Sequence, residues 1–112
     1  MPELGALKAD TRPPVERVHE ARKKTFEGEL AAKGIQKYEE ESAVRFPSSM
    51  GDARWSEFTG KGGMWATSFH GIRATIMGTD RAIYAECWCP EADWVLLKPA
   101  FQRMIGSITP GG

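Results

Sequence analysis

Residues 81–108, RAIYAECWCPEADWVLLKPAFQRMIGSI, decide the fold. The first nine of them are mostly aromatic, β-branched and small apolar side chains, which predicts a strand over 81–89. Pro90 ends this strand, and the acidic residues after it are typical of the first turn of a helix. Apolar side chains then recur at helical spacing up to Ile108. We therefore expect a strand and a closing amphipathic helix that together supply much of the core.

The closing helix is expected to bury one stripe of its surface. Pro99 interrupts the pattern, so the sequence predicts either a kink or a short turn followed by a helix that begins near Lys98. The predicted buried stripe, at three- and four-residue spacing, consists of Trp94, Leu97, Phe101, Met104 or Ile105, and Ile108.

The chain before this stretch predicts one more helix and several strands. Residues 13–34 carry apolar side chains at three- and four-residue spacing with charged ones opposite, which indicates a helix that ends at Gly34. His19 falls on the charged flank of this helix. The period then changes to two, which indicates strands. The predicted strands cover residues 35–46, 53–59, 64–77 and 81–89.

Glycine-containing turns separate the predicted strands. Gly60-Lys61-Gly62-Gly63 is expected to form a hairpin turn, and Gly71 predicts a bend, a bulge or a division of its strand. Short turns favour antiparallel neighbours, because parallel pairing needs long crossovers. The sequence therefore predicts an α+β fold: an antiparallel meander of four to five strands flanked by an N-terminal and a C-terminal helix.

The size and charge of the chain limit what it is expected to bind. Its 112 residues suit one domain over residues 13–108, preceded by a flexible arm over 1–12. Fifteen basic and fifteen acidic residues cancel, so we expect no nucleic-acid partner. No apolar run approaches the roughly 18 residues of a membrane span. We expect a cytoplasmic protein, although an exported form without its leader would have the same sequence.

Few residues point to catalysis or metal binding. Cys87 and Cys89 share a face of their strand, where a local disulfide would be strained. Cysteine and histidine are too few to complete a four-ligand metal site, so we expect no metal and no cofactor. Either cysteine with His70 and Asp80 supplies the residue types of a nucleophilic site, but the spacing gives no sign that they meet. We expect the protein not to be an enzyme.

An acidic run and the tryptophans are the remaining candidates for a functional site. The run Glu39–Glu41 is expected to be a solvated edge that repels strand addition rather than a paired-carboxylate site. Most of the four tryptophans are expected in the core, with one or two at a groove or interface. The candidate binding residues are Trp55, Trp65, His70, Trp88 and Trp94.

The order of the elements resembles the PsbP-like fold family. The residues that carry the resemblance are Tyr84, Pro90, Phe101, Ile105, Ser107 and Ile108. The family includes the photosystem II protein PsbP, the Ran-binding nuclear import factor of yeast and DcrB-type bacterial lipoproteins. The resemblance covers about residues 13–108 and implies an α/β/α sandwich, with helices on both faces of the sheet. Its members share a fold and bind different partners, so no site residue is carried over.

The resemblance also bears on self-association. Members of the family begin with a β-hairpin, and only twelve residues precede Pro13 here. Without that hairpin, a sheet edge or apolar surface is expected to be open to another chain. We therefore expect a non-enzymatic protein-binding or assembly module that forms a homodimer, joined at an edge other than Glu39–Glu41 or at a tryptophan-bearing face. A different protein partner is the main competitor to the second copy.

A second function remains open from the sequence. The chain would suit a small-molecule-binding domain if a pocket lined by tryptophan and methionine lay between the sheet and a helix. A flat apolar surface would favour the protein-binding module instead.

Overall fold

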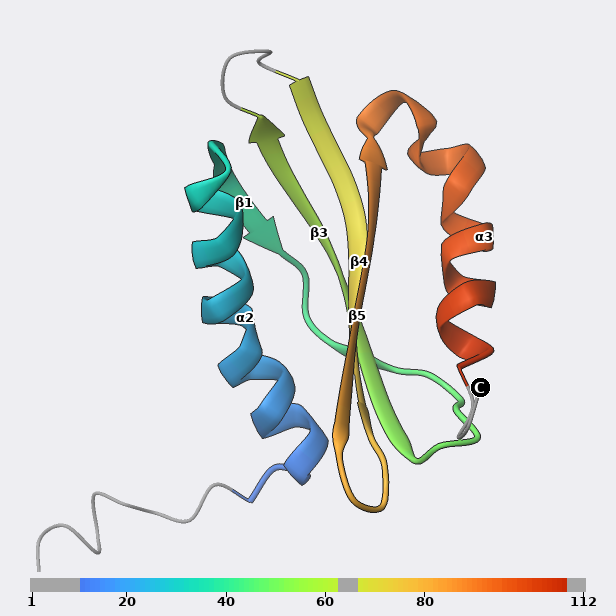
Figure 1. The fold of residues 1–112 in the computed structure, drawn as a ribbon. Helices are drawn as coiled ribbons and strands as arrows, with labels where there is room; N and C mark the ends of the chain where they lie inside the picture. The colour runs from blue at the N-terminus through green and yellow to red at the C-terminus, as the bar shows by residue number, and fades with distance from the viewer. Residues whose placement is uncertain (1–10, 63–66, 109–112) are drawn as a thin grey trace, which may run out of the picture.

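Two helices enclose one antiparallel sheet in the computed structural model, which describes residues 11–62 and 67–108. Helix α2 covers one face of the sheet and α3 the other (Figure 1). The elements in chain order are α2 (Pro14–Ala32), β1 (Ile35–Glu40), β2 (Val44–Arg45), β3 (Asp52–Gly62), β4 (Thr67–Met77), β5 (Ala82–Pro90), the 3-10 turn η1 (Glu91–Asp93) and α3 (Trp94–Gly106). The predicted α+β class and antiparallel sheet are confirmed. Most of the predicted arm, residues 1–12, lies outside the described residues.

The sheet is built around the long β3–β4 hairpin. Its strand order is β1-β3-β4-β5, and β2 also pairs with β3. Strands β3 and β4 keep one register from Asp52↔Met77 to Gly62↔Thr67. The prediction of one strand over 35–46 is wrong: β1 and β2 are separate and short. The register of β1 shifts between Gln36 and Glu39, where Lys37 has a positive φ of 54°.

Helix α2 agrees with its prediction, whereas α3 begins earlier than expected. Helix α2 starts with Pro14 in its first turn, as expected. It ends at Ala32, and Gly34 follows with a φ of 86°, a conformation that favours glycine. Helix α3 begins at Trp94 rather than near Lys98 and passes through Pro99. Pro99 lacks the N–H that would bond the carbonyl of Val95. Because Val95 is 87% exposed, water can hydrate the carbonyl there, and the helix tolerates the proline.

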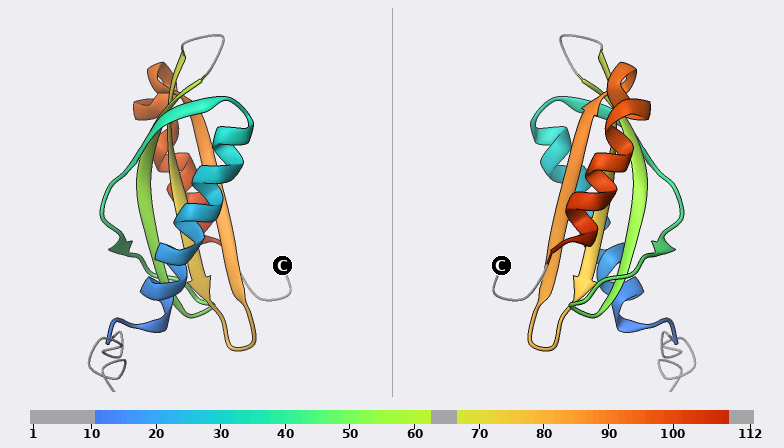
Figure 2. Two further views of the ribbon diagram at one scale, coloured as in Figure 1. Left: turned by 90° about the vertical axis from the view of Figure 1, so that its left-hand side faces the viewer. Right: turned by 90° about the vertical axis from the view of Figure 1, so that its right-hand side faces the viewer.

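The two faces of the sheet, one crossed by α2 and the other by α3 (Figure 2), have different cores. Beneath α3 the buried residues are apolar: Phe46, Ala53, Ile72, Ala74, Ile76, Cys89, Trp94 and Ile105. In the predicted stripe, Ile105 is buried, whereas Met104 is 60% exposed. Beneath α2 the apolar cluster is smaller and is formed by Phe26, Leu30 and Phe58, with Ile35 and Tyr38 packed against it. Polar side chains fill much of the remaining α2 face.

Gly71 does not bend or divide its strand. Strand β4 is continuous through it, paired with β3 and β5 on both sides. A Cβ atom at this position would lie 2.4 Å from the carbonyl oxygen of Cys87 and 2.6 Å from Cζ of Phe58. The glycine is therefore required by close packing. The predicted turn at 60–63 is also displaced: Gly60 to Gly62 belong to β3, and Gly63 lies outside the described residues.

Candidate functional site

The structure separates most of the predicted binding residues. Trp55 is half-buried and stacks on Phe46, at a centroid distance of 4.1 Å, beneath the apolar side of the sheet. Trp88 lies on the other face and contacts Phe26 of α2. Trp65 lies outside the described residues. Of the predicted residues that the structure describes, only His70 and Trp94 come together.

A polar cluster surrounds His70 where β4 passes under the start of α3. The imidazole stacks on the indole of Trp94, with centroids 3.9 Å apart and planes 9° apart. Its Nε2 lies 3.1 Å from Oε1 of Glu57, and its Nδ1 lies 3.1 Å from Oε2 of Glu91. Lys98 of α3 donates to the other oxygen of Glu57 at 2.6 Å. His70 is thus held from three sides.

The carboxylate of Glu57 contacts both His70 and Lys98 in this cluster. Burial alone would raise the pKa of its carboxyl, but hydrogen bonds from Lys98 and His70 outweigh burial and lower the pKa. The carboxylate is therefore ionised at neutral pH. The backbone N–H of Glu41 donates to the carbonyl of Glu57 at 2.8 Å, which holds the Glu41 backbone beside Glu57. Ligand atoms of Glu41, Glu57 and His70 all lie within 4.8 Å of one another.

Sequence reasoning missed Glu57, Glu91 and Lys98, and it assigned Glu41 to a solvated edge. Glu57 and His70 are thirteen positions apart, and Lys98 is 41 positions from Glu57. The register Thr59↔His70 places Glu57 and His70 diagonally on neighbouring strands, on one face. A correct register for the β3–β4 hairpin would have paired Glu57 with His70. The sequence analysis placed the turn at 60–63, inside β3, and therefore did not give that register.

The cysteines have the character of structural thiols. Both are free, Cys87 half-buried and Cys89 buried beneath α3. Burial and the nearby carboxylate of Glu86 raise the pKa of the Cys87 thiol. Burial and the acidic residues that follow β5 raise the pKa of Cys89. Sγ of Cys89 contacts the backbone oxygen of His70 rather than its ring. Higher thiol pKa values mean less thiolate at neutral pH.

Asp80 completes no nucleophilic site with His70. It lies in the turn after β4, exposed and paired with Arg81, whereas His70 lies near the opposite end of that strand. The structure therefore places Cys89 opposite His70 on the neighbouring strand but leaves Asp80 away from both.

A buried ion pair lies beneath α2. Arg73 of β4 donates from Nε and Nη2 to the two carboxylate oxygens of Glu40, at 2.8 and 2.7 Å. The side chains are 1% and 4% exposed. The hydroxyl of Tyr38 donates to Glu40 as well. Burial alone would raise the pKa of Glu40, but these hydrogen bonds outweigh it and lower the pKa. The predicted solvated edge is wrong for Glu40, because this side chain turns inward to Arg73.

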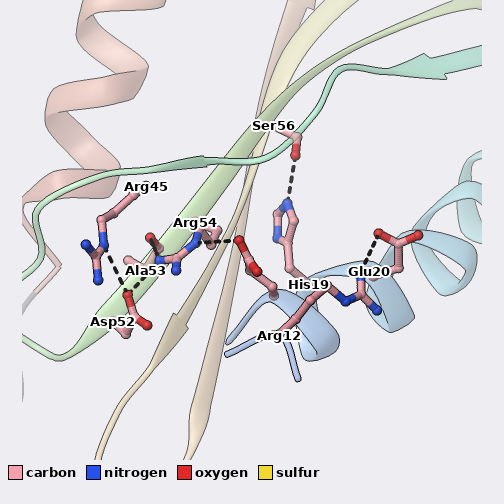
Figure 3. Close-up of polar contacts among 9 residues, drawn as sticks. Arg12, His19, Glu20, Arg45, Asp52, Ala53, Arg54 and Ser56 are labelled. Carbon is pink, nitrogen blue, oxygen red and sulfur yellow. Dashed lines mark hydrogen bonds and ion pairs between the residues drawn. The ribbon is translucent and has the colours of Figure 1, made fainter. Parts of the chain in front are cut away.

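His19 is part of the same polar layer. It was predicted on a charged flank, but it is only 3% exposed. Its ring nitrogens lie 2.8 Å from the hydroxyl oxygens of Ser56 and Thr75, which lie diagonally across β3 and β4. These two hydrogen bonds are the reason that His19 turns toward the sheet. Figure 3 shows the His19–Ser56 contact beside Arg54. Burial, followed by the charge of Arg73, lowers the pKa of His19 to about 4.

Strand β5 presents an open edge. Among the strands that the structure describes, it pairs with β4 alone. The N–H of Gly78 donates to the carbonyl of Arg81 at 2.8 Å, so Arg81 faces β4 with its backbone groups. The register then runs without a shift from Met77↔Ala82 to Phe69↔Pro90. Because the two sides of an antiparallel strand alternate, odd-numbered residues of β5 bond to β4 and even-numbered ones direct their N–H and C=O groups outward. The outward residues with both groups are Ala82, Tyr84, Glu86 and Trp88.

The opposite edge of the sheet is protected. Strand β1 is interrupted by its register shift and carries Lys37 and Glu39 in an exposed, irregular backbone. Irregular backbone and charge are the usual devices that prevent strand addition. Strand β5 has a regular register over its length and a single charged residue, Glu86. The two edges therefore differ in their readiness to pair.

Exposed aromatic rings lie beside the open edge. Tyr84 and Trp88 are 43% and 36% exposed on the α2 side of the sheet. The guanidinium of Arg22 lies 5.1 Å from the Tyr84 ring centre, and Nζ of Lys33 lies 5.9 Å from that of Trp88. This combination of aromatic area and outward backbone groups is suited to another polypeptide.

Two hollows of the described surface differ from the predicted small-molecule pocket in lining or in size. One, of about 720 Å³, is an open depression along residues 45–53 whose lining includes neither tryptophan nor methionine. Another, lined by Trp55, Ile72 and Gln102 among others, has a volume of about 60 Å³. Pockets for small organic ligands are typically about 300–1,000 Å³ and enclose most of the ligand. The pocket lined by tryptophan and methionine stays a prediction.

Comparisons with known proteins add no assignment. A scan against protein-family models finds no match, and searches of curated proteins and of solved structures find none either. None of the described helices is both long and apolar enough to span a membrane.

Proposed function

We propose that the protein is a non-enzymatic assembly module that binds a second copy of itself along the open edge of β5. The observation that carries the proposal is the contrast between the two edges. Strand β5 offers nine residues in regular register with one charge, whereas β1 is short and interrupted. An unprotected edge of this kind pairs readily with another strand.

A twofold axis at Ala85 gives a favourable register for this pairing. Two β5 strands then run antiparallel, and Tyr84 of each copy lies opposite Glu86 of the other. Ala82 lies opposite Trp88, so all four outward residues exchange hydrogen bonds across the joint. On the α3 face, Ala85 meets Ala85 and Ile83 meets Cys87. The joint is therefore aromatic and polar on one face and apolar on the other.

Two neighbouring registers, with the axis at Glu86 or at Cys87, are less favourable. An axis at Glu86 places two carboxylates directly opposite each other, and like charges in that position destabilise a sheet. An axis at Cys87 brings Pro90 into the joint, and proline has no N–H to donate. The Ala85 axis avoids both. The same surface serves both copies, as a closed dimer requires.

Other observations agree with a binding role. The thiol pKa values are raised, and both ring nitrogens of His70 contact carboxylates rather than a nucleophile. We also propose that the chain has the PsbP-like fold; helices on both faces of the sheet, with Ile105 buried in the last helix, support this assignment. A strand from a different protein is the competing occupant of the β5 edge.

The experiment replaces Glu86, whose N–H points away from β4. Glu86→Pro removes an outward donor without breaking a bond to β4, so the monomer should fold. The wild-type protein is expected to sediment with the mass of two chains at micromolar concentration, and Glu86→Pro with the mass of one. Glu86→Gln, which retains the N–H, is the matched control and should remain dimeric.

Circular dichroism and thermal melting establish that each variant is folded. Wild-type protein with the mass of one chain across the micromolar range would contradict self-association. A Glu86→Pro variant that stays dimeric would show that the copies meet elsewhere.

A further inference from the structure

We propose that His70, Glu57 and Glu41 form a binding site for a divalent transition-metal cation of the Zn²⁺ type. The site is independent of the β5 edge. No metal site was expected because cysteine and histidine are few. The fold adds the carboxylates of Glu41 and Glu57 to His70 as possible ligands. These three residues come from β4, from β3 and from the chain just after β1.

The spacing of the two central ligands matches a shared metal ion. Nε2 of His70 and Oε1 of Glu57 are 3.1 Å apart. Two bonds of about 2.05 Å to one Zn²⁺ hold their donor atoms about 2.9 Å apart at a right angle and about 3.3 Å apart at the tetrahedral angle. The observed distance lies between these values. Binding therefore replaces the direct hydrogen bond without moving either strand.

Glu41 supplies the third ligand. Its backbone is fixed to Glu57 by the 2.8 Å hydrogen bond, and its side chain is exposed and free to rotate inward. The donor atoms are already within 4.8 Å of one another, so a change of rotamer closes the set. Water occupies the remaining position of a four-coordinate Zn²⁺ in sites with three protein ligands.

The surroundings of His70 are those of a metal ligand. Nδ1, the nitrogen that faces away from Glu57, contacts the carboxylate of Glu91 at 3.1 Å. A carboxylate behind a metal-ligating histidine fixes the tautomer that leaves Nε2 free to coordinate. The indole of Trp94 stacks on the imidazole and holds its orientation.

The charges of the cluster also favour a divalent cation. With neutral His70, the carboxylates of Glu41, Glu57 and Glu91 and the ammonium of Lys98 leave two net negative charges. Lys98 contacts Oε2 of Glu57, so Oε1 remains available to the metal. A site with one imidazole and two carboxylates suits Zn²⁺, Co²⁺ or Ni²⁺, because Mg²⁺ and Ca²⁺ select oxygen ligands alone.

Isothermal titration of metal-free protein with Zn²⁺ tests the site. We expect one ion per chain for the wild type. His70→Gln and Glu41→Gln are each expected to weaken binding about tenfold or more. Glu39→Gln is the matched control: it removes an exposed carboxylate two residues from Glu41 and should leave the affinity within twofold. Lys98→Gln should strengthen binding several-fold, because it removes the positive charge beside Glu57.

Three results would overturn the proposal. The first is the absence of saturable binding up to about 1 mM Zn²⁺. The second is equal Zn²⁺ affinity in the wild type and His70→Gln. The third is an equal loss of Zn²⁺ affinity in Glu41→Gln and Glu39→Gln. Binding that survives His70→Gln but is lost in Cys87→Ser would assign the ion to the thiols instead. Should His70→Gln fail to fold, the comparison of Glu41→Gln with Glu39→Gln, both at exposed positions, still decides the question.

Discussion

Glu40→Ala is expected to destabilise the protein by about 3–5 kcal/mol. The substitution leaves the guanidinium of Arg73, only 1% exposed, without its carboxylate partner, and an unpaired buried charge costs about that much. The Tyr38 hydroxyl loses its acceptor in the same step. Urea unfolding at pH 7.5 measures the free energy. Since about 1 kcal/mol corresponds to roughly 4–8 °C for a domain of this size, the melting temperature should fall by tens of degrees.

A double variant distinguishes the unpaired charge from general damage to the core. Arg73→Met combined with Glu40→Leu removes both charges and fills the space with apolar atoms. Such replacements are often neutral or stabilising, so the double variant should be more stable than either single one. If Glu40→Ala does not fold at all, recovery of a folded double variant still supports the explanation. A Glu40→Ala protein that melts within a degree or two of the wild type would contradict it.

Acidification from pH 6.5 to 4 is expected to remove about 3 kcal/mol of stability through His19. Its pKa is about 4 in the folded protein, against 6.5 when unfolded. Between these values the unfolded chain binds a proton that the folded one does not, so stability falls as the pH falls. Above pH 6.5 both states are neutral and the full stability is present. The lowered pKa of Glu40 adds a further loss only below its usual value.

His19→Gln isolates this effect, because glutamine does not titrate and retains a hydrogen-bonding side chain. Urea unfolding of wild type and variant at intervals from pH 7.5 to 4.5 gives the two pH profiles. The wild type should lose stability more steeply, and the difference between the proteins should narrow as the pH falls. His70 is present in both proteins and cancels in the comparison. Parallel profiles would show that His19 is not held neutral.

The sequence predicts the elements of this fold better than their boundaries. The helix from Pro14 and the strand before Pro90 follow from periodicity and from proline chemistry, which are local. Local patterns do not predict that the closing helix continues through Pro99, because this depends on which side of the helix faces water. Gly71 shows the same limit. A glycine in a strand predicts irregularity, whereas here the close approach of Phe58 and Cys87 requires it.

The candidate sites depend on pairs that are distant in the sequence. Arg73 and Glu40 are 33 positions apart, and only the sheet and the α2 layer make them partners. His70 was identified as a candidate, but its carboxylate partners required the β3–β4 register. Trp88 was identified from its residue type, whereas the open edge beside it required the strand order. Local patterns indicate which residues carry chemistry, and the register decides which of them meet.

Oxidative cross-linking of Ala85→Cys tests the β5 joint most directly. In the proposed register Ala85 lies on the twofold axis, opposite itself in a pair without hydrogen bonds, where Cα atoms are about 4.5 Å apart. That separation lies within the range of a disulfide. Mild oxidation is expected to convert Ala85→Cys to a covalent dimer. The wild type, whose Cys87 faces Ile83 of the second copy, is expected to stay uncross-linked. Cross-linking of the wild type through Cys87, or none in Ala85→Cys, would contradict it.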